Sequence, residues 1–447
     1  MTILVDPRQA QAFRFVRCTY ADGEAQLVYA LDDGPELIER IGFPDAPKLP
    51  REREAAFAAA LRLLHLIAGT SYYKAGVPKG IVVAGEPLDA ATARFLDQVY
   101  LHGLAEFAYQ NKLDLRDRIR FPQGAVEAAS APALNLSRRT LIPIGGGKDS
   151  LVSVEMLKRM GEPATAVWVG DSALIAACAQ RTGLPMLNLK RRLAPELFEY
   201  NRLGAYNGHI PVTAINSAIL LCAAIVYGFD AIAFSNERSA SEATLEYDGQ
   251  LVNHQWSKSL DSERLLREHI TSHIATDLDY FSLLRPWSEL AVASAFARES
   301  RYDDVFSSCN RNFRIRGERP ADRWCGQCPK CHFVFLALAP FVAKPRLLNI
   351  FGRNLLDDLG LAPGFDALLE YREHKPFECV GEGRESRAAM VALSLRPEWR
   401  EDALVARFAE EIAPQLDAAS LKLAPLLEPS AEHFLPLRLQ RLLHETG

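Results

Sequence analysis

A glycine-rich segment carries the clearest chemical signal in the chain. The run Gly145 to Gly147 is followed directly by Lys148, Asp149 and Ser150, and an apolar stretch, Leu141 to Ile144, precedes it. A segment with helical periodicity follows. Free backbone N–H groups at the start of a helix, together with the helix dipole, favour an anion, and glycine lets the main chain approach it closely. The sequence therefore predicts a phosphate-binding loop between a strand and a helix.

Two common phosphate loops do not fit. The P-loop pattern needs a glycine five residues before its Gly-Lys pair and a Ser or Thr after the lysine, whereas Ile142 and Asp149 occupy these positions. The dinucleotide pattern would place its third glycine at Ser150, and only Asp171 could serve as the acidic residue after the second strand.

The segment instead resembles the PP-loop of ATP pyrophosphatases, SGGxDS, with Gly145 in place of the first serine. The resemblance implies that residues 145–150 bind ATP: Gly146, Gly147 and Ser150 would hold the β,γ-pyrophosphate, and Asp149 would orient the loop or Mg²⁺. The implied chemistry is cleavage between the α- and β-phosphates, which leaves an adenylated carboxylate or amide. Backbone donors and Mg²⁺ would stabilise the departing charge. A glycine-rich turn without a ligand is the alternative.

Four cysteines have the spacing of a metal site. Cys325, Cys328 and Cys331 form C-x2-C-x2-C, and Cys309 lies sixteen residues upstream. Four thiolates at such spacing suit a tetrahedral structural Zn²⁺; a [4Fe–4S] cluster or no metal are the alternatives. The other cysteines lie mostly in apolar segments and are expected in the core, although Cys379 sits in a stretch rich in Lys, Pro and Gly.

Composition excludes several classes of protein. The formal net charge is −5, so nothing global favours nucleic acid as a partner. The N-terminus lacks a basic start followed by an apolar stretch, and no apolar run approaches the roughly 20 residues that span a bilayer. Eight cysteines in 447 residues do not indicate a disulfide scaffold. We expect a cytoplasmic protein without a membrane span.

The middle of the chain alternates between short apolar strands and helices. Such a pattern predicts a parallel, doubly wound α/β sheet, whose ligands bind at the carboxyl ends of the strands. The strands expected are 141–144, 165–169, 185–189, 231–235 and 281–284, and the helices are 150–160, 172–182, 211–227 and 287–298.

Three domains are expected from these patterns. Residues 1–135 form a mixed α/β domain, with a hairpin at the Asp22-Gly23 turn and helices over 51–67 and 89–109. Residues 136–343 form the nucleotide-binding domain with the four cysteines. Residues 344–447 form a helical region without a motif that we could interpret.

Several polar side chains are predicted to lie at the same edge of the sheet as the glycine loop. His209 precedes the long apolar helix, Glu237 follows the strand 231–235, and His254 and Lys258 come shortly after. Such residues beside a nucleotide loop are candidates for acid–base work, with capping or loop hydrogen bonding as the alternative.

A PP-loop followed by four cysteines resembles 7-cyano-7-deazaguanine synthase over roughly residues 139–338. That enzyme adenylates a carboxylate and converts it to a nitrile with ammonia. The resemblance leaves the N-terminal domain and the helical tail unexplained.

A second resemblance covers nearly the full length. The segments GGGKDS, FSNERSA, NHQWSKS, LLRPWSELA and WCGQCPKC are similar to the UDP-N-acetylmuramoyl-L-alanyl-L-glutamate epimerases, the MurL family of bacterial peptidoglycan synthesis. The resemblance implies inversion of the terminal L-glutamate to D-glutamate with ATP and Mg²⁺, releasing AMP and pyrophosphate. It also implies a neighbouring ligase that adds L-glutamate. The substrate diphosphate would need cations, for which the candidates are Arg238, Arg314, Arg316 and Arg319.

The implied activity is chemically coherent. Removing the α-proton of a free carboxylate produces a dianion, whereas adenylation neutralises the carboxylate and makes the α-carbon acidic. The catalytic candidates are Asp149, which would orient the loop or Mg²⁺, and Glu237, His209, His254 and Lys258, from which the proton-transfer pair would come. A nitrile synthase remains the competing enzyme, and a non-catalytic ATP sensor is the competing binding module. A tRNA-modifying PP-loop protein is disfavoured by the net charge.

Overall fold

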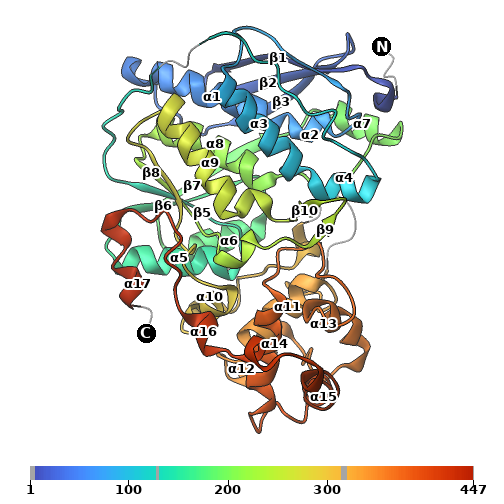
Figure 1. The fold of residues 1–447 in the computed structure, drawn as a ribbon. Helices are drawn as coiled ribbons and strands as arrows, with labels where there is room; N and C mark the ends of the chain where they lie inside the picture. Colours follow the sequence, from blue (N-terminus) through green and yellow to red (C-terminus); the bar gives the residue numbers. More distant parts are fainter. Residues whose placement is uncertain (1–5, 127–129, 314–319, 446–447) are drawn as a thin grey trace.

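A nine-stranded sheet forms the centre of the protein, in the order β11-β8-β5-β6-β7-β3-β2-β1-β4 (Figure 1). The computed structural model describes residues 6–126, 130–313 and 320–445. The strands of this sheet are β1 (Ala12–Ala21), β2 (Glu24–Leu31), β3 (Leu37–Gly42), β4 (Gly80–Val83), β5 (Thr140–Pro143), β6 (Ala164–Val169), β7 (Met186–Arg192), β8 (Ala231–Phe234) and β11 (Asp279–Ser282). A separate ribbon consists of β9 (Leu245–Tyr247) and β10 (Gln250–Val252).

The strands β11, β8, β5, β6 and β7 pair in parallel, as the sequence predicted. The chain runs from β5 outward to β6 and β7, then returns to place β8 and β11 on the other side of β5. The order therefore reverses between β5 and β8. Ligands of open α/β sheets bind at the carboxyl ends of the strands at such a reversal. The glycine loop after β5 and the residues after β8 meet there.

The N-terminal strands extend the same sheet. Strand β3 pairs antiparallel with β7, so the sheet continues across residue 135. The predicted hairpin is confirmed: β1 and β2 are antiparallel around Asp22 and Gly23, whose φ angles are 49° and 75°. Two central residues with positive φ give the turn the right-handed twist that a hairpin needs.

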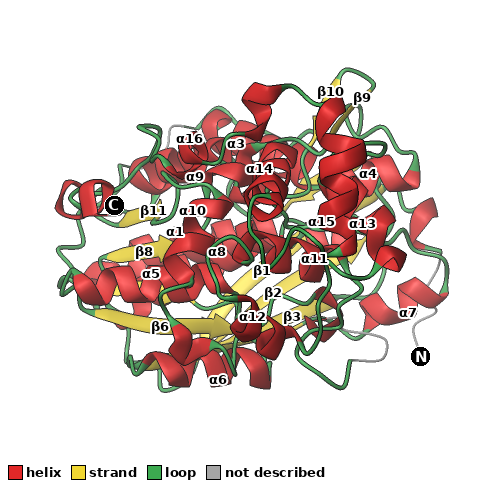
Figure 2. Cartoon of the chain, turned by 90° about the horizontal axis from the view of Figure 1, so that it is seen from below, coloured by secondary structure: helices red, strands yellow, loops and turns green. Residues whose placement is uncertain are grey.

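Helices cover both faces of the sheet (Figure 2). Alternate residues of one strand enter opposite cores: Leu141 belongs to the core that residues 54–111 and 212–273 share, and Ile142 belongs to the core that residues 148–159, 289–296 and 329–394 share. The helices are α1 (Glu54–Ala68), α2 (Thr70–Tyr73), α3 (Ala90–Gly103), α4 (Ala105–Asn111), α5 (Lys148–Arg159), α6 (Ala173–Thr182), α7 (Glu196–Arg202), α8 (Val212–Tyr227), α9 (Leu260–His273), α10 (Glu289–Phe296), α11 (Pro329–Leu338), α12 (Lys344–Phe351), α13 (Ala362–Leu368), α14 (Gly383–Ser394), α15 (Ala403–Arg407), α16 (Ala424–Leu427) and α17 (Leu442–Glu445).

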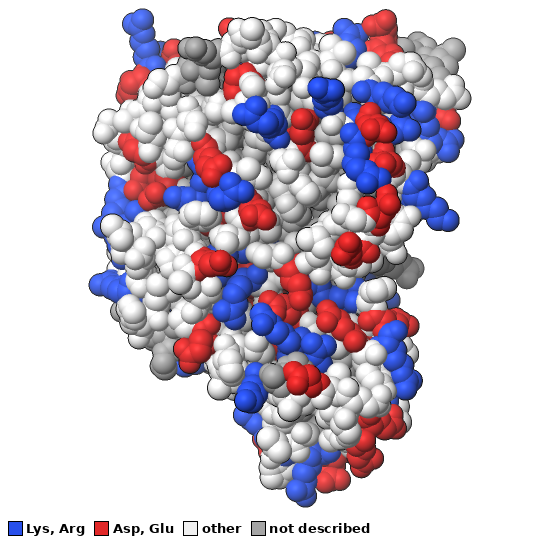
Figure 3. Space-filling view, in the orientation of Figure 1, with Lys and Arg blue, Asp and Glu red and all other residues white. Residues whose placement is uncertain are grey.

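One helical stretch, Arg51–Tyr73, is long and apolar enough by composition to cross a membrane, but 78% of its apolar window is buried inside the protein. A core helix passes the same test, and α1 packs against the buried helix α8. Acidic and basic side chains are interspersed over the face drawn in Figure 3, with no field of one sign.

The residues after 343 are helical, as expected, and α11 to α15 form the lower part of Figure 1. Their core is continuous with that of α5 and α10. Trp399 is completely buried there, and its ring lies edge-on to Phe335 of α11 at 6.1 Å. The helical region is therefore anchored to the cysteine-bearing helix.

Candidate active site

The glycine loop is tightly enclosed at two of its three glycines. Gly146 has a φ of +85°, and a Cβ there would lie 2.9 Å from Leu174 Cδ2. A Cβ on Gly147 would lie 2.6 Å from Ser308 Oγ, whereas a Cβ on Gly145 would meet nothing within 4 Å. The positive φ at Gly146 and the close contact at Gly147 therefore favour glycine at both positions. The absence of the motif's serine at 145 has no steric cause.

Helix α5 begins at Lys148, two residues before the predicted start. Gly147 is its N-cap, and no side chain caps the first turn. The Ser150 hydroxyl accepts a hydrogen bond from the Gly145 N–H at 3.4 Å and donates to the Gly147 carbonyl at 3.2 Å. The loop thus presents uncapped backbone donors, which is the property that an anion site needs.

Lys148 is buried in ion pairs. Its ammonium group pairs with Glu289 of α10, and the two side chains are 1% and 2% exposed. It also pairs with Asp149. Burial opposes the charge of Lys148, but the two carboxylates outweigh burial and raise its pKa. In this structure the Lys148 ammonium group links α5 to α10 through an ion pair. Lys148 therefore has a structural role that the other predicted ATP-binding residues lack.

Two carboxylates at the sheet reversal have opposite protonation tendencies. Glu237 follows β8, is 4% exposed, and its Oε1 has no hydrogen-bond partner in the described part of the chain. Burial, with Glu289 and Asp149 nearby, raises the pKa of Glu237 to about 7. Burial would also raise the pKa of Asp149, but lysines, Lys148 first, lower it. At neutral pH Asp149 is ionised and Glu237 is partly protonated.

A histidine pair lies beside a buried glutamate of α4. His254 Nδ1 donates a hydrogen bond to Glu106, and His209 Nδ1 is 3.7 Å from the same carboxylate oxygen. Burial would lower the pKa of His254, but hydrogen bonds to Cys379 and Glu106 raise it to about 9. Burial and the adjacent cations His254 and Lys258 lower the pKa of His209 to about 3. His254 is therefore a cation at neutral pH, and His209 is neutral.

Cys379 completes this cluster. Its Sγ accepts a hydrogen bond from Lys258 Nζ at 3.2 Å, and the charge of His254 also acts on the sulfur. Burial would raise the pKa of the thiol, but Lys258 and His254 lower it to about 5. The pKa of Lys258 is in turn raised against burial by Cys379 and Glu237. Cys379 is partly exposed. The cluster thus holds a thiolate beside two cations.

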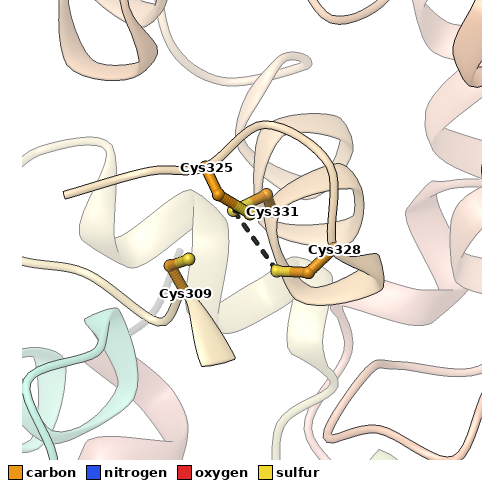
Figure 4. A group of neighbouring side chains, drawn as sticks. All are labelled: Cys309, Cys325, Cys328 and Cys331. Atoms are coloured by element: carbon orange, nitrogen blue, oxygen red, sulfur yellow. Dashed lines mark hydrogen bonds between the residues drawn. The ribbon is translucent and has the colours of Figure 1, made fainter. Parts of the chain in front are cut away.

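The four predicted metal ligands converge. The sulfurs of Cys309, Cys325, Cys328 and Cys331 all lie within 4.8 Å of one another, and the side chains point to a common centre (Figure 4). The Cys325–Cys331 and Cys328–Cys331 sulfur distances are 3.8 and 3.5 Å. A tetrahedron with Zn–S bonds of about 2.3 Å has edges of about 3.8 Å. The four thiols, none of them in a disulfide, fit such an ion.

Two family models cover most of the chain. The MurL N-terminal domain matches residues 4–283, and the MurL C-terminal domain matches residues 305–422. The chain belongs to the MurL family. A UDP-N-acetyl-alpha-D-muramoyl-L-alanyl-L-glutamate epimerase of Xanthomonas oryzae pv. oryzae is 58% identical, with 96% of each chain covered. Relatives of the same name from Salinispora tropica and a Micromonospora species are 42% identical over 96% of this chain, and over 95% and 97% of their own lengths.

Both MurL domains contribute to the cluster. The N-terminal domain supplies the glycine loop, Glu237, His254 and Lys258, and the C-terminal domain supplies Cys379 and Lys330. Lys330 lies between two of the clustered cysteines, and its Nζ donates to the Cys379 carbonyl. The site is complete only when the two MurL domains pack together.

The predicted phosphate-binding arginines are only partly described. Arg314, Arg316 and Arg319 lie outside the described residues. Arg238 donates to the carbonyls of Leu426 and Glu428 at 3.3 and 3.2 Å, and its Nε is buried without a partner in the described chain. Arg238 also lines a cavity of about 620 Å³.

The structure brings all five predicted catalytic candidates into one cluster, in which the charge of Lys258 acts on Asp149, Glu237 and His209. Sequence reasoning missed Glu106, Glu289, Lys330 and Cys379. Glu106 and Glu289 lie in segments that were predicted only as helices, and Lys330 lies inside the cysteine motif, where the metal ligands drew the attention. Cys379 did carry a signal, because its Pro- and Gly-containing surroundings differ from the apolar segments of the core cysteines.

Proposed function

We propose that this chain is an ATP-consuming epimerase that inverts the terminal L-glutamate of UDP-N-acetylmuramoyl-L-alanyl-L-glutamate in peptidoglycan synthesis. The observation that carries the proposal is the 58% identity, over 96% of both chains, to the Xanthomonas oryzae relative of that name. The buried acid–base cluster beside the glycine loop supports it, because epimerisation needs two proton-transfer groups in one site.

Activation of the carboxylate would come first. The glutamate carboxylate attacks the α-phosphorus of ATP, an acyl adenylate forms, and pyrophosphate leaves. The PP-loop assignment of residues 145–150 rests on the motif and on the uncapped start of α5. Asp149, ionised in the first turn of α5, is the carboxylate placed to hold Mg²⁺, which would neutralise phosphate charge.

Proton transfer would follow on the activated substrate. Adenylation withdraws electrons from the α-carbon, so a base can remove its proton and an acid can return one on the other face. Hydrolysis of the adenylate then releases AMP and makes the inversion irreversible. A Zn²⁺ ion bound by the four cysteines would have a structural role, since four thiolates leave no open coordination position.

The proposed substrate implies a preceding enzyme and a location for the reaction. The reaction needs a ligase that attaches L-glutamate to the UDP-linked muramoyl-alanine. We place the epimerase in the cytoplasm, where ATP and UDP-linked precursors occur together.

The test combines the purified protein, ATP, Mg²⁺ and the UDP-linked L-Ala-L-Glu substrate in D₂O. We expect AMP, pyrophosphate and a D-glutamyl product with deuterium at the α-carbon. A parallel reaction with ammonia tests the nitrile synthase alternative. Absence of AMP, AMP without inversion, or a product that requires ammonia would each contradict the proposal.

A further inference from the structure

The proposed epimerisation leaves open which groups move the α-proton. The cluster contains several candidates, but a base must have a free electron pair when the reaction starts. His254 and Lys258 are hydrogen-bonded cations: His254 donates to Glu106, and Lys258 donates to Cys379. Neither can accept a proton. His209 is neutral, but its lowered pKa of about 3 makes it a weak base.

The Cys379 sulfur is the acceptor toward which both cations are directed. Lys258 Nζ lies 3.2 Å from Sγ, and His254 is held in position by the buried carboxylate of Glu106. A nucleophile or base oriented by a histidine, which is itself oriented by a carboxylate, is a recurrent catalytic arrangement. Here the histidine is a cation, so it stabilises the thiolate and does not deprotonate it.

A second, independent observation concerns the buried carboxyl group of Glu237. Glu237 is 4% exposed and its Oε1 has no hydrogen-bond partner in the described chain. Buried carboxyl oxygens are almost always hydrogen-bonded, so such a group needs a reason to persist. Its protonated form can donate a hydrogen bond to a ligand. Lys258 donates a hydrogen bond to Cys379, and the charge of Glu237 also raises the pKa of Lys258, so the carboxylate lies within electrostatic range of the same ammonium.

We propose that the Cys379 thiolate removes the α-proton of the activated L-glutamate and that the Glu237 carboxylic acid returns a proton on the opposite face. This inference rests on the proposed function. The Cα–H bond breaks, its proton forms the Cys379 S–H bond, and the electron pair moves onto the acyl oxygen. The O–H bond of Glu237 then breaks and a new Cα–H bond forms. Exchange with solvent restores the thiolate and the acid, and no electrons are gained or lost.

The starting protonation states match this direction. At neutral pH the thiol, with its pKa lowered to about 5, is ionised, and Glu237, with its pKa raised to about 7, is partly protonated. Two groups whose environments move their pKa values in opposite directions are the usual mark of an acid–base pair. Cys379 is a partly exposed residue of the loop that precedes α14.

The decisive experiment compares Cys379→Ala and Glu237→Gln in the full-length protein with the L-epimer in D₂O. We expect Cys379→Ala to release AMP within about fivefold of the wild-type rate but to invert glutamate at least about 100-fold more slowly, without α-deuterium. Glu237→Gln should introduce deuterium with retention of the L-configuration, because the thiolate still removes the proton. Cys18→Ser, in strand β1 far from the cluster, should match wild type.

The outcomes separate the two proposals. If the wild-type protein forms no AMP or no D-glutamate, the proposed function is wrong. If wild type inverts and Cys379→Ala inverts at more than about a tenth of that rate, only the role of Cys379 is wrong. Loss of AMP release together with inversion, in a folded Cys379→Ala, would assign the sulfur to activation and overturn its role as the base.

Alkylation gives a readout that does not depend on the variants folding or on activity. Iodoacetamide should modify Cys379 of the wild-type protein with a midpoint well below the usual thiol pKa, as mapped by mass spectrometry. Lys258→Met should move that midpoint upward. A wild-type midpoint between pH 8 and 9 would overturn the thiolate.

Discussion

Lys330 Nζ lies 3.6 Å from Glu289 Oε1, in a contact where both side chains are almost fully buried. Lys330 is in the first turn of α11, between Cys328 and Cys331, and Glu289 begins α10. The same ammonium group donates to the Cys379 carbonyl. The cysteine cluster is therefore linked through one side chain to the ion pairs beside the glycine loop and to the loop that carries the thiolate.

Removal of the metal should impair epimerisation indirectly. Cys328→Ser deletes one of four thiolates, and we expect loss of Zn²⁺ by elemental analysis and a lower melting temperature. Because the start of α11 would loosen, Lys330 would no longer hold the Cys379 loop. We predict at least a tenfold fall in inversion with a smaller change in AMP release.

The matched control is Cys222→Ala, which truncates a buried cysteine of α8 outside the cluster. Some loss of stability is expected there, but no loss of metal. A Cys328→Ser protein that keeps one equivalent of Zn²⁺, or that loses metal without losing activity, would contradict the link.

The buried ion pair between Lys148 and Glu289 predicts a large stability change. Lys148→Met leaves Glu289 with Lys330 as its remaining cation, and removing one partner of a buried pair costs about 3–5 kcal/mol. The double variant Lys148→Met/Glu289→Gln should recover part of that loss, because the uncompensated charge is gone. The free energy of unfolding in urea measures both.

An exposed pair supplies the comparison. Lys190 pairs with Asp171, with 42% and 81% of their side chains exposed. Lys190→Met should cost less than about 1 kcal/mol, because solvent screens such pairs. If the two substitutions lowered the free energy of unfolding equally, the buried pair would contribute no more to stability than the exposed pair.

The sequence was sufficient for the parallel sheet because its strands are short apolar runs between helical patterns. Residues 165–169 and 231–235, for example, were each placed within one residue of β6 and β8. It could not show that β3 joins β7, since pairing between distant strands leaves no local pattern. The residues of the candidate site likewise include some that the local sequence predicted and some that it could not. His254 and Lys258 stood out as polar residues near a strand end, whereas Glu106 becomes functional only because folding brings α4 to His254.

The raised pKa of Glu237 predicts how stability depends on pH. Its pKa moves from 4.5 to about 7 on folding, so between these values the folded protein holds a proton that the unfolded chain has released. The free energy of unfolding should therefore fall as pH rises through this range. Glu237→Gln removes the effect and should be more stable than wild type at pH 8, on the order of 1–3 kcal/mol. At pH 4 the two should be equal. Exposed Glu52→Gln should leave the pH profile unchanged; a profile unaffected by Glu237→Gln would disprove the shift.

Gly146 offers a test of the nucleotide loop. Gly146→Ala imposes a side chain at φ +85° and places its Cβ 2.9 Å from Leu174. The strained φ and the contact with Leu174 both disturb the loop, and we predict at least a tenfold fall in kcat/KM for ATP. Gly161→Ala is the matched control, because Gly161 also has a positive φ, +67°, but faces open space after α5. It should lose about 1–2 kcal/mol of stability while KM for ATP stays the same. Similar KM values in the two variants would place ATP elsewhere.

Arg238 gives a test of where the substrate diphosphate binds. Its guanidinium donates to the Leu426 and Glu428 carbonyls, yet its Nε is unpaired and the side chain borders a cavity of about 620 Å³. If the diphosphate binds there, Arg238→Ala should raise KM for the UDP-linked substrate about tenfold with little change in kcat, since a charge-assisted hydrogen bond contributes about 1.5–3 kcal/mol. Arg264→Ala, at the exposed rim of the same cavity, should raise KM by less. A lower melting temperature with an unchanged KM would show that Arg238 only fastens the segment around α16.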